Sequence, residues 1–231
     1  YTCGVGPCSA PRTGGGGGGR VAVTGYVLLS GSFSDAAAAI HTYGGSGHQM
    51  GGAGTVFLSH ILATDGHLFV DNGDHDDQSA QGVTHLPNVT EGLTLLVQGE
   101  QLYNFGAFTP DTLIGLTIDP NIGQGSSVSL SDHHLFHVTA NTADELFLAP
   151  REEGVVLAEI AALGTSYRGV LPLDSLTVQG KALLITDGDI LIWQGDGSSE
   201  AGLFVVEDDA AITARGLDVV NATSLSAITG D

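Results

Sequence analysis

Basic residues are scarce in this sequence. Lys and Arg number 6 in 231 residues, against 26 Asp and Glu, and the formal net charge is −20. A phosphate backbone or an anionic membrane surface is bound by basic side chains, so neither nucleic acid nor such a membrane is an expected partner. Cations are the natural partners of so acidic a chain, unless the carboxylates serve only to keep a β-rich surface soluble.

Long apolar runs and aromatic side chains are also lacking. No run approaches the roughly 18 uninterrupted apolar residues of a membrane helix, so no membrane span is expected. Aromatic residues make up 6% of a chain that is 42% hydrophobic, which predicts a core filled by small and branched aliphatic side chains. Glycine is abundant, with 35 residues, but the lack of a Gly-X-Y period excludes a collagen helix.

Only two cysteines are present, Cys3 and Cys8, within the segment CGVGPC. Gly4, Gly6 and Pro7 allow the chain to turn back between them, so we expect a disulfide and an oxidising compartment. Two free thiols or a weak metal pair are the alternative.

Two N-glycosylation sequons begin at Asn88 and Asn221, as Asn-Val-Thr and Asn-Ala-Thr. A three-residue motif is weak evidence by itself, because such motifs often arise by chance. Together with the expected disulfide and the near absence of lysine, the sequons indicate a secreted glycoprotein that lies outside the cell or at its surface.

Short apolar runs separated by glycine or Asp-Gly turns recur along most of the chain, which predicts an all-β fold. In the last third, the runs follow one another at short intervals without helices between them, as in a parallel β-helix or solenoid. A β-sandwich is the alternative. We expect strands at residues 20–24, 26–30, 37–42, 55–60, 67–71, 93–98, 112–118, 127–130, 135–139, 145–148, 176–180, 182–188, 190–193, 203–206, 211–214 and 217–220.

The domain organisation follows from these patterns. Residues 1–19 are expected to form a Gly-rich head that carries the disulfide, and residues 20–231 a single solenoid-like domain. A division of this domain near residues 150–170 is left open, because the strand pattern is weak there. Within that region, apolar residues at helical spacing predict a short helix over Glu152–Leu163.

Carboxylates gather around the end of one predicted strand, at Asp71, Asp74, Asp76 and Asp77. Carboxylate and carbonyl oxygens on a loop are the ligands that calcium prefers, so we hypothesise a calcium site here. The spacing does not match an EF-hand, and a solvated acidic loop is the alternative. No other cofactor is expected.

Motifs of catalysis are not found. The chain has neither a Gly-x-Ser-x-Gly elbow nor a His-Glu-x-x-His zinc motif. His133, His134 and His137 lie close together, but on a strand His134 points away from the other two, and zinc would need a further convergent ligand. The run Asp-Gly-Asp at 187–189 is interpreted as an ordinary turn. We therefore expect that the chain is not an enzyme.

The N-terminal part resembles a known block. Residues 15–23 are GGGGGRVAV, residues 51–58 are GGAGTVFL and residues 68–73 are LFVDNG. This order, over about residues 14–73, resembles very large secreted proteins of protists and algae that contain Gly-rich β-helical and EGF-like segments. Those proteins include surface proteins and flagellar-hair (mastigoneme) proteins. The resemblance implies a structural, extracellular role and supplies no catalytic residue.

These observations together favour a structural glycoprotein module. We expect it to build a cell-surface or flagellar-appendage filament or matrix, by packing against copies of itself or against other segments of a larger assembly. Two alternatives stay open. One is a carbohydrate-active or carbohydrate-binding β-helix, either enzyme or adhesin. The other is a calcium-dependent adhesion module.

Overall fold

The computed structural model describes residues 15–33, 39–46, 51–63, 65–73, 82–123, 133–193, 203–206, 210–214, 216–220 and 224–227. The all-β class expected from the sequence is confirmed, and helix is confined to short segments such as η1 (Gly31–Phe33) and α2 (Leu157–Ile160). The strands are β1 (Arg20–Tyr26), β2 (Thr55–His60), β3 (His67–Asp71), β4 (Val83–His85), β5 (Gly92–Leu93), β6 (Leu96–Gln98), β7 (Gln101–Tyr103), β8 (Thr117–Asp119), β9 (Phe136–Asn141), β10 (Glu145–Pro150), β11 (Ser166–Leu173), β12 (Ser175–Gln179), β13 (Leu183–Ile185), β14 (Asp189–Trp193), β15 (Leu203–Val206), β16 (Ala211–Thr213), β17 (Gly216–Val220) and β18 (Ser224–Ala227).

Parallel pairing joins strands into three ladders. The first ladder runs β3-β12-β15-β18, the second β4-β13-β16 and the third β11-β14-β17. The pairing is in register, so that Leu68 lies opposite Leu176, which lies opposite Phe204. Strands far apart in the sequence thus become neighbours, and His67 contacts Ser175, 108 residues away.

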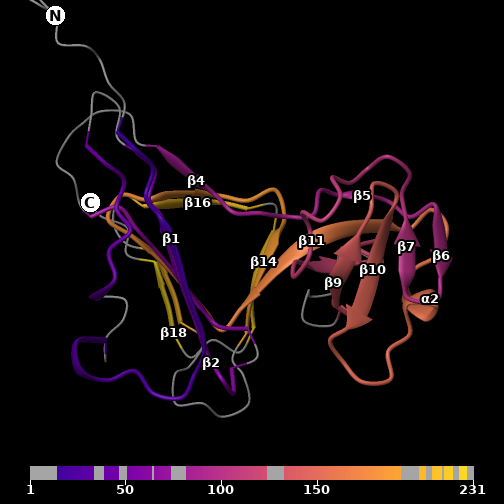
Figure 1. Cartoon of the computed structure of the whole chain (residues 1–231), viewed down its shortest axis with the longest axis horizontal. Helices are drawn as coiled ribbons and strands as arrows, with labels where there is room; N and C mark the ends of the chain where they lie inside the picture. Colours follow the sequence, from indigo (N-terminus) through magenta and orange to yellow (C-terminus); the bar gives the residue numbers. More distant parts are fainter. Residues whose placement is uncertain are drawn as a thin grey trace, which may run out of the picture.

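The three ladders, which we call the stack, surround one aliphatic core. Inward positions alternate along each strand, as in β3, where Leu68 and Val70 are buried between half-buried neighbours. All three ladders contribute to a single buried cluster, with Val178 from β12, Leu184 from β13 and Ile190 from β14. Figure 1 shows the ladders as sides of a triangle around this core. A sequence rich in aliphatic and poor in aromatic residues suits such layers.

The chain leaves the stack after β4 and returns at β11, and residues 86–123 and 133–165 form a second body that we call the lobe (Figure 1). Its strands β6 to β10 pair in antiparallel fashion, and Leu102, Phe136 and Leu146 belong to its own buried cluster. Because β8 also pairs antiparallel with β11, the third ladder continues into the lobe as one nine-stranded sheet.

Glycine-rich segments 15–19, 42–45 and 51–54 pack backbone against backbone, and we call them the glycine layer. The Gly18 N–H donates to the Gly52 carbonyl oxygen at 2.8 Å. A Cβ at Gly18 would overlap backbone atoms of the opposite segments. Gly15 and Gly18 of the glycine run are therefore packing positions, since only glycine allows backbones to approach so closely.

Asn72 ties the glycine layer to the end of β3. Its buried side chain accepts a hydrogen bond from the Gly44 N–H at 3.0 Å and donates one to the Gly51 carbonyl oxygen at 3.4 Å. The first ladder is also extended here, because β2 pairs antiparallel with β3 and parallel with β1. The three sequence pieces GGGGGRVAV, GGAGTVFL and LFVDNG therefore lie side by side.

Local predictions agree with the structure at several strands and fail at others. The strand expected over 26–30 is wrong, because β1 ends at Tyr26 and left-handed backbone at Gly25 and Gly31 bends the chain. The strand expected over 37–42 is wrong over its described residues 39–42, which form no strand. The strands expected over 55–60 and 67–71 are β2 and β3. The strand expected over 112–118 is wrong, because left-handed backbone at Asp111 and Gly115 places turns there and β8 begins only at Thr117. The helix expected over 152–163 is reduced to the four residues of α2, since positive φ angles at the two flanking glycines, 154 and 164, bend the chain.

Candidate functional site

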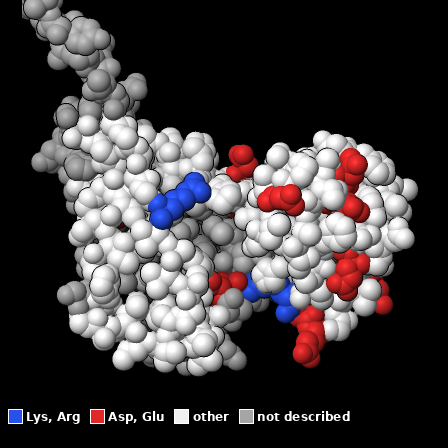
Figure 2. Space-filling view, viewed as in Figure 1, with Lys and Arg blue, Asp and Glu red and all other residues white. Residues whose placement is uncertain are grey.

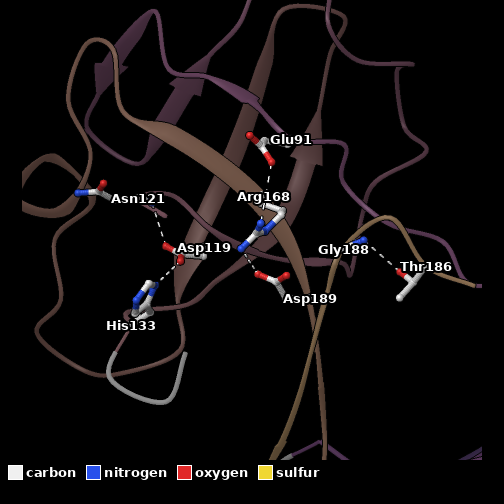
Figure 3. Close-up of polar contacts among 8 residues, drawn as sticks. All are labelled: Glu91, Asp119, Asn121, His133, Arg168, Thr186, Gly188 and Asp189. Carbon is white, nitrogen blue, oxygen red and sulfur yellow. Dashed lines mark hydrogen bonds and ion pairs between the residues drawn. The ribbon is translucent and has the colours of Figure 1, made fainter. Parts of the chain in front are cut away.

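Ionisable side chains gather where the lobe meets the stack, and they are the most distinctive polar feature among the described residues. Figure 3 shows them on β8, β11, β14 and the adjoining loops. We call Glu91, Asp119, His133, Arg168 and Asp189 the junction cluster. Asp119 and Asp189 are each 1% exposed, which for carboxylates requires compensation by cations or hydrogen-bond donors.

Asp119 at the end of β8 pairs with His133. Its Oδ2 atom contacts the imidazole Nδ1 atom of His133, and its Oδ1 atom accepts the backbone N–H of Asn121 at 2.9 Å. Asn121 in turn donates to the carbonyl oxygen of Ile160 at the end of α2, at 2.8 Å. Both oxygens of this buried carboxylate are therefore satisfied. The Nε2 atom of His133 is buried and has no hydrogen-bond partner.

Arg168 on β11 pairs with Asp189 at the start of β14. The guanidinium Nη2 atom contacts Asp189 Oδ2, and Nη1 lies 3.9 Å from Glu91 Oε2. Arg168 stands opposite Asp119 across the antiparallel pair of β11 and β8. The side chains of His133, Asp119, Arg168 and Asp189 thus follow one another across the junction, as Figure 3 shows.

Apolar contacts flank the junction cluster. Leu191, on the same strand as Asp189, packs with Val170 of β11 and Leu135 of the lobe in a small buried cluster. Leu191 is 0% exposed although its neighbours Ile190 and Ile192 already fill the core of the stack. The lobe therefore covers the outer face of β14, which explains why this strand is apolar at consecutive positions.

A second ion pair crosses between the two bodies. Arg151, which follows β10, contacts Asp65 in the connection between β2 and β3 at 2.8 Å, and both side chains are more than nine-tenths buried. His137 lies nearby, where its Nδ1 atom is 3.0 Å from the Thr117 hydroxyl. Burial lowers the pKa of His137 and the positive charge of Arg151 lowers it further, while Asp65 opposes both.

Two tyrosines of the lobe also titrate abnormally. Burial raises the pKa of Tyr167, although its hydroxyl accepts a hydrogen bond from Asn104 at 2.8 Å, which acts in the opposite direction. The pKa of Tyr103 is raised chiefly by a hydrogen bond with Glu145. The ring of Tyr167 belongs to the buried cluster of the lobe, and the ring of Tyr103 lies beside that of Phe105.

The junction cluster is suited to holding surfaces together. Its carboxylates face cations at short range, so replacing one partner would leave an uncompensated buried charge. Among the described residues, no group of three or more His, Cys, Asp or Glu side chains is placed to hold a metal ion. An Asp–His pair can act as a general base where the far nitrogen reaches a substrate, but here that nitrogen is enclosed.

An apolar cavity of about 350 Å³ lies apart from the junction, beside β1 and β2. Val23, Leu29, Ile40 and Leu58 line it, and Ser30 is the one polar residue among its described lining residues. Ligand pockets usually combine an apolar wall with several convergent polar groups. This cavity therefore offers little to orient a polar ligand.

Most of the site residues predicted from the sequence lie outside the described part of the chain. Cys3, Cys8 and Asn221 lie outside the described residues, as do Asp74, Asp76 and Asp77. Asp71 is described, and its oxygens accept the Gly73 N–H at 2.8 Å and the Gln179 side-chain N–H at 3.0 Å. Asn88 lies in the connection from β4 to β5, with its Nδ2 atom buried.

The histidine triplet separates in space. His133 pairs with Asp119, the exposed His134 lies 3.1 Å from Glu152 and His137 contacts Thr117. The residues that sequence reasoning missed are Arg168 and Asp189. A signal was present, because Asp189 begins the uniformly apolar run 190–192, and a strand that is apolar throughout is buried on both faces. A charge at its edge then needs a partner.

None of the helices among the described residues has the length and apolar character required to cross a bilayer. Comparisons with protein-family models, curated proteins and solved structures found no match for this chain.

Proposed function

We propose that the chain is a structural module of an extracellular, cell-surface assembly, and that the stack is a short parallel β-helix. The order of the strands supports this fold. After the lobe returns at β11, the chain visits the first, second and third ladders in the same sequence twice, through β12-β13-β14 and then β15-β16-β17. Each strand pairs in parallel with its equivalent, as successive coils of a solenoid do.

The observation that carries the structural role is the nine-stranded sheet. It runs without interruption from β17 in the stack to β6 at the far side of the lobe. Tension applied across the two bodies would load many backbone hydrogen bonds together, as well as the buried pairs Arg168–Asp189 and Arg151–Asp65. A continuous sheet, together with ion pairs that join the stack to the lobe, is suited to bearing mechanical load.

The two ends of the stack differ in a way that favours assembly at one of them. On the first side, β3 is covered by β2, β4 by the glycine layer through the Gly52–Gly82 bridge, and β11 by β8. On the other side, β16, β17 and β18 end their ladders among the described residues. An unpaired strand edge is a template for another strand. We propose that this end pairs with a second copy of the chain.

Surface charge is consistent with an extracellular module. Figure 2 shows Asp and Glu side chains spread over the lobe on the face drawn, with few basic side chains. The buried carboxylates of Asp65, Asp119 and Asp189 are engaged with Arg151, His133 and Arg168, respectively. Such engagement supports a role in cohesion over a role as the acid and base of a glycosidase, whose carboxylates must face a substrate.

Self-assembly tests this proposal directly. The purified chain should form oligomers that lengthen with concentration in analytical ultracentrifugation and appear as regularly repeating fibres in electron micrographs. Thr213→Lys adds a charge to the exposed end strand β16, and edge lysines oppose strand pairing, so this variant should stay monomeric.

Thr109→Lys makes the same charge change on an exposed turn of the lobe and should assemble like the parent chain. A parent chain that remains monomeric over the whole concentration range, or equal assembly of both variants, would contradict the proposal.

A further inference from the structure

Asn88 occupies the point at which the chain leaves the stack for the lobe. The flanking Val89 is fully buried in the lobe cluster, and its carbonyl oxygen accepts the N–H of Gly169 on β11 at 2.9 Å. Thr90, the third residue of the sequon, is exposed. The segment is therefore held against β11 on one side while part of the sequon faces solvent.

The Asn88 side chain fills a notch between two glycines. A Cβ atom at Gly169 or at Gly188 would overlap the carboxamide of Asn88. Gly188 directly precedes β14, whose first residue is Asp189 of the junction cluster. The two glycines thus make room for the Asn88 side chain where the stack and the lobe meet. Neither glycine position has space for a Cβ atom of its own beside the carboxamide.

The Nδ2 atom of Asn88 is buried and has no hydrogen-bond partner. An N-linked glycan replaces one hydrogen of this nitrogen with a bulky sugar, which must lie on the surface. Asn88 as a whole is partly exposed, but its Nδ2 atom is buried, and a sugar on that atom needs space that the closely packed Gly169 and Gly188 occupy.

We propose that Asn88 is a closed sequon: a packing residue that seats the lobe on the stack, so that a glycan at Asn88 and the docked lobe exclude each other. The inference rests on the proposed extracellular setting only because N-glycosylation occurs in the secretory pathway. The folded, secreted chain then carries Asn88 unmodified. Asn88 differs in this respect from a sequon on an exposed loop.

Site mapping in a secreting eukaryotic host tests the inference. The chain is digested, deglycosylated enzymatically in heavy-oxygen water and examined by mass spectrometry. As an internal control, Gln98→Asn with Glu100→Thr creates a sequon at the exposed β6–β7 turn. Occupancy at Asn88 should be at least about tenfold lower than at this control, because only the control lies on an accessible surface.

Two variants that both destroy the sequon separate packing from glycosylation. Asn88→Ala empties the notch and should lower the melting temperature by about 2–4 °C, as expected for a loss near 1 kcal/mol in a chain of this length. Thr90→Ala keeps the carboxamide and should melt like the parent. High occupancy at Asn88 in a chain that melts normally, or equal melting of the two variants, would overturn the inference. Neither outcome depends on whether the chain assembles.

Discussion

The stack and the lobe bury their side chains by different means. In the stack, strands distant in sequence pair in parallel, and like residues such as Leu68 and Leu176 align in columns. In the lobe, neighbouring strands pair antiparallel around a cluster that includes the buried rings of Phe136 and Tyr167. The columns of the stack can be extended by adding equivalent strands. In the lobe, turns join neighbouring antiparallel strands, so the sheet has no repeating unit to add. The buried charges of the junction cluster lie where these two modes of packing meet.

The sharpest test of this division is to remove one charge from the junction. Asp189→Ala removes the buried carboxylate beside the partly buried Arg168 and leaves Glu91 at 3.9 Å, so it should reduce the free energy of unfolding by about 3 kcal/mol. The lobe should then lose hydrogen-exchange protection before the stack does. Denaturant titration followed by circular dichroism, with exchange measured by mass spectrometry, gives both quantities.

The matched double variant Arg168→Met with Asp189→Leu should recover most of that loss, because it replaces both charges with apolar side chains. Glu152→Ala removes the exposed pair with His134 and should cost less than about 1 kcal/mol. If Asp189→Ala and Glu152→Ala behave alike, the junction cluster does not hold the two bodies together.

A second test addresses the glycine layer, which belongs to the stack side alone. Gly18→Ala should cost about 1–3 kcal/mol, because its Cβ would overlap backbone atoms that cannot rotate away. Gly17→Ala should be close to neutral, since its Cβ would meet nothing within 4 Å. Limited proteolysis should detect the damage in the glycine layer while the lobe stays resistant. Equal sensitivity of the two variants would show that the layer is not close-packed.

Much of the local structure was predictable from the sequence. The alternation in β3 and the short apolar runs at β12 to β17 indicated strands. These features depend on neighbouring residues, which pattern reasoning reads well. The strand expected over 112–118 failed for a tertiary reason. The turns there are fixed by Asn141, whose side chain accepts the Leu113 N–H and donates to the Thr109 carbonyl oxygen.

The junction cluster was not predicted, because it is made by long-range pairing. Asp119 and Arg168 face each other only because β8 pairs with β11, and the residues around each of them do not indicate the register of that pairing. Asp189 was interpreted as part of a turn because Gly188 precedes it. The burial of Asn88 could not be predicted for the same reason. Three neighbouring residues define the sequon, whereas the burial of the Asn88 nitrogen depends on two glycines that are distant in the sequence.

The smallest expected effect concerns pH, again at the boundary between lobe and stack. His137 has its pKa lowered, first by burial and then by Arg151, with Asp65 acting in the opposite direction and the Thr117 hydroxyl in contact. The unfolded chain, with a histidine pKa near 6.5, therefore takes up the proton first as pH falls. The stability that neutral His137 contributes is present above about pH 6.5 and is lost as pH falls through the lower, folded pKa.

His137→Gln should accordingly show a shallower loss of unfolding free energy than the parent between about pH 7 and about pH 5, measured by denaturant titration at each pH. The carboxylates and other histidines titrate in both chains, so the difference between them isolates this one group. His134→Gln, where the imidazole lies 3.1 Å from Glu152, is the control for removing an imidazole. If it flattens the profile equally, the desolvation of His137 and the charge of Arg151 are not the cause of the pH dependence.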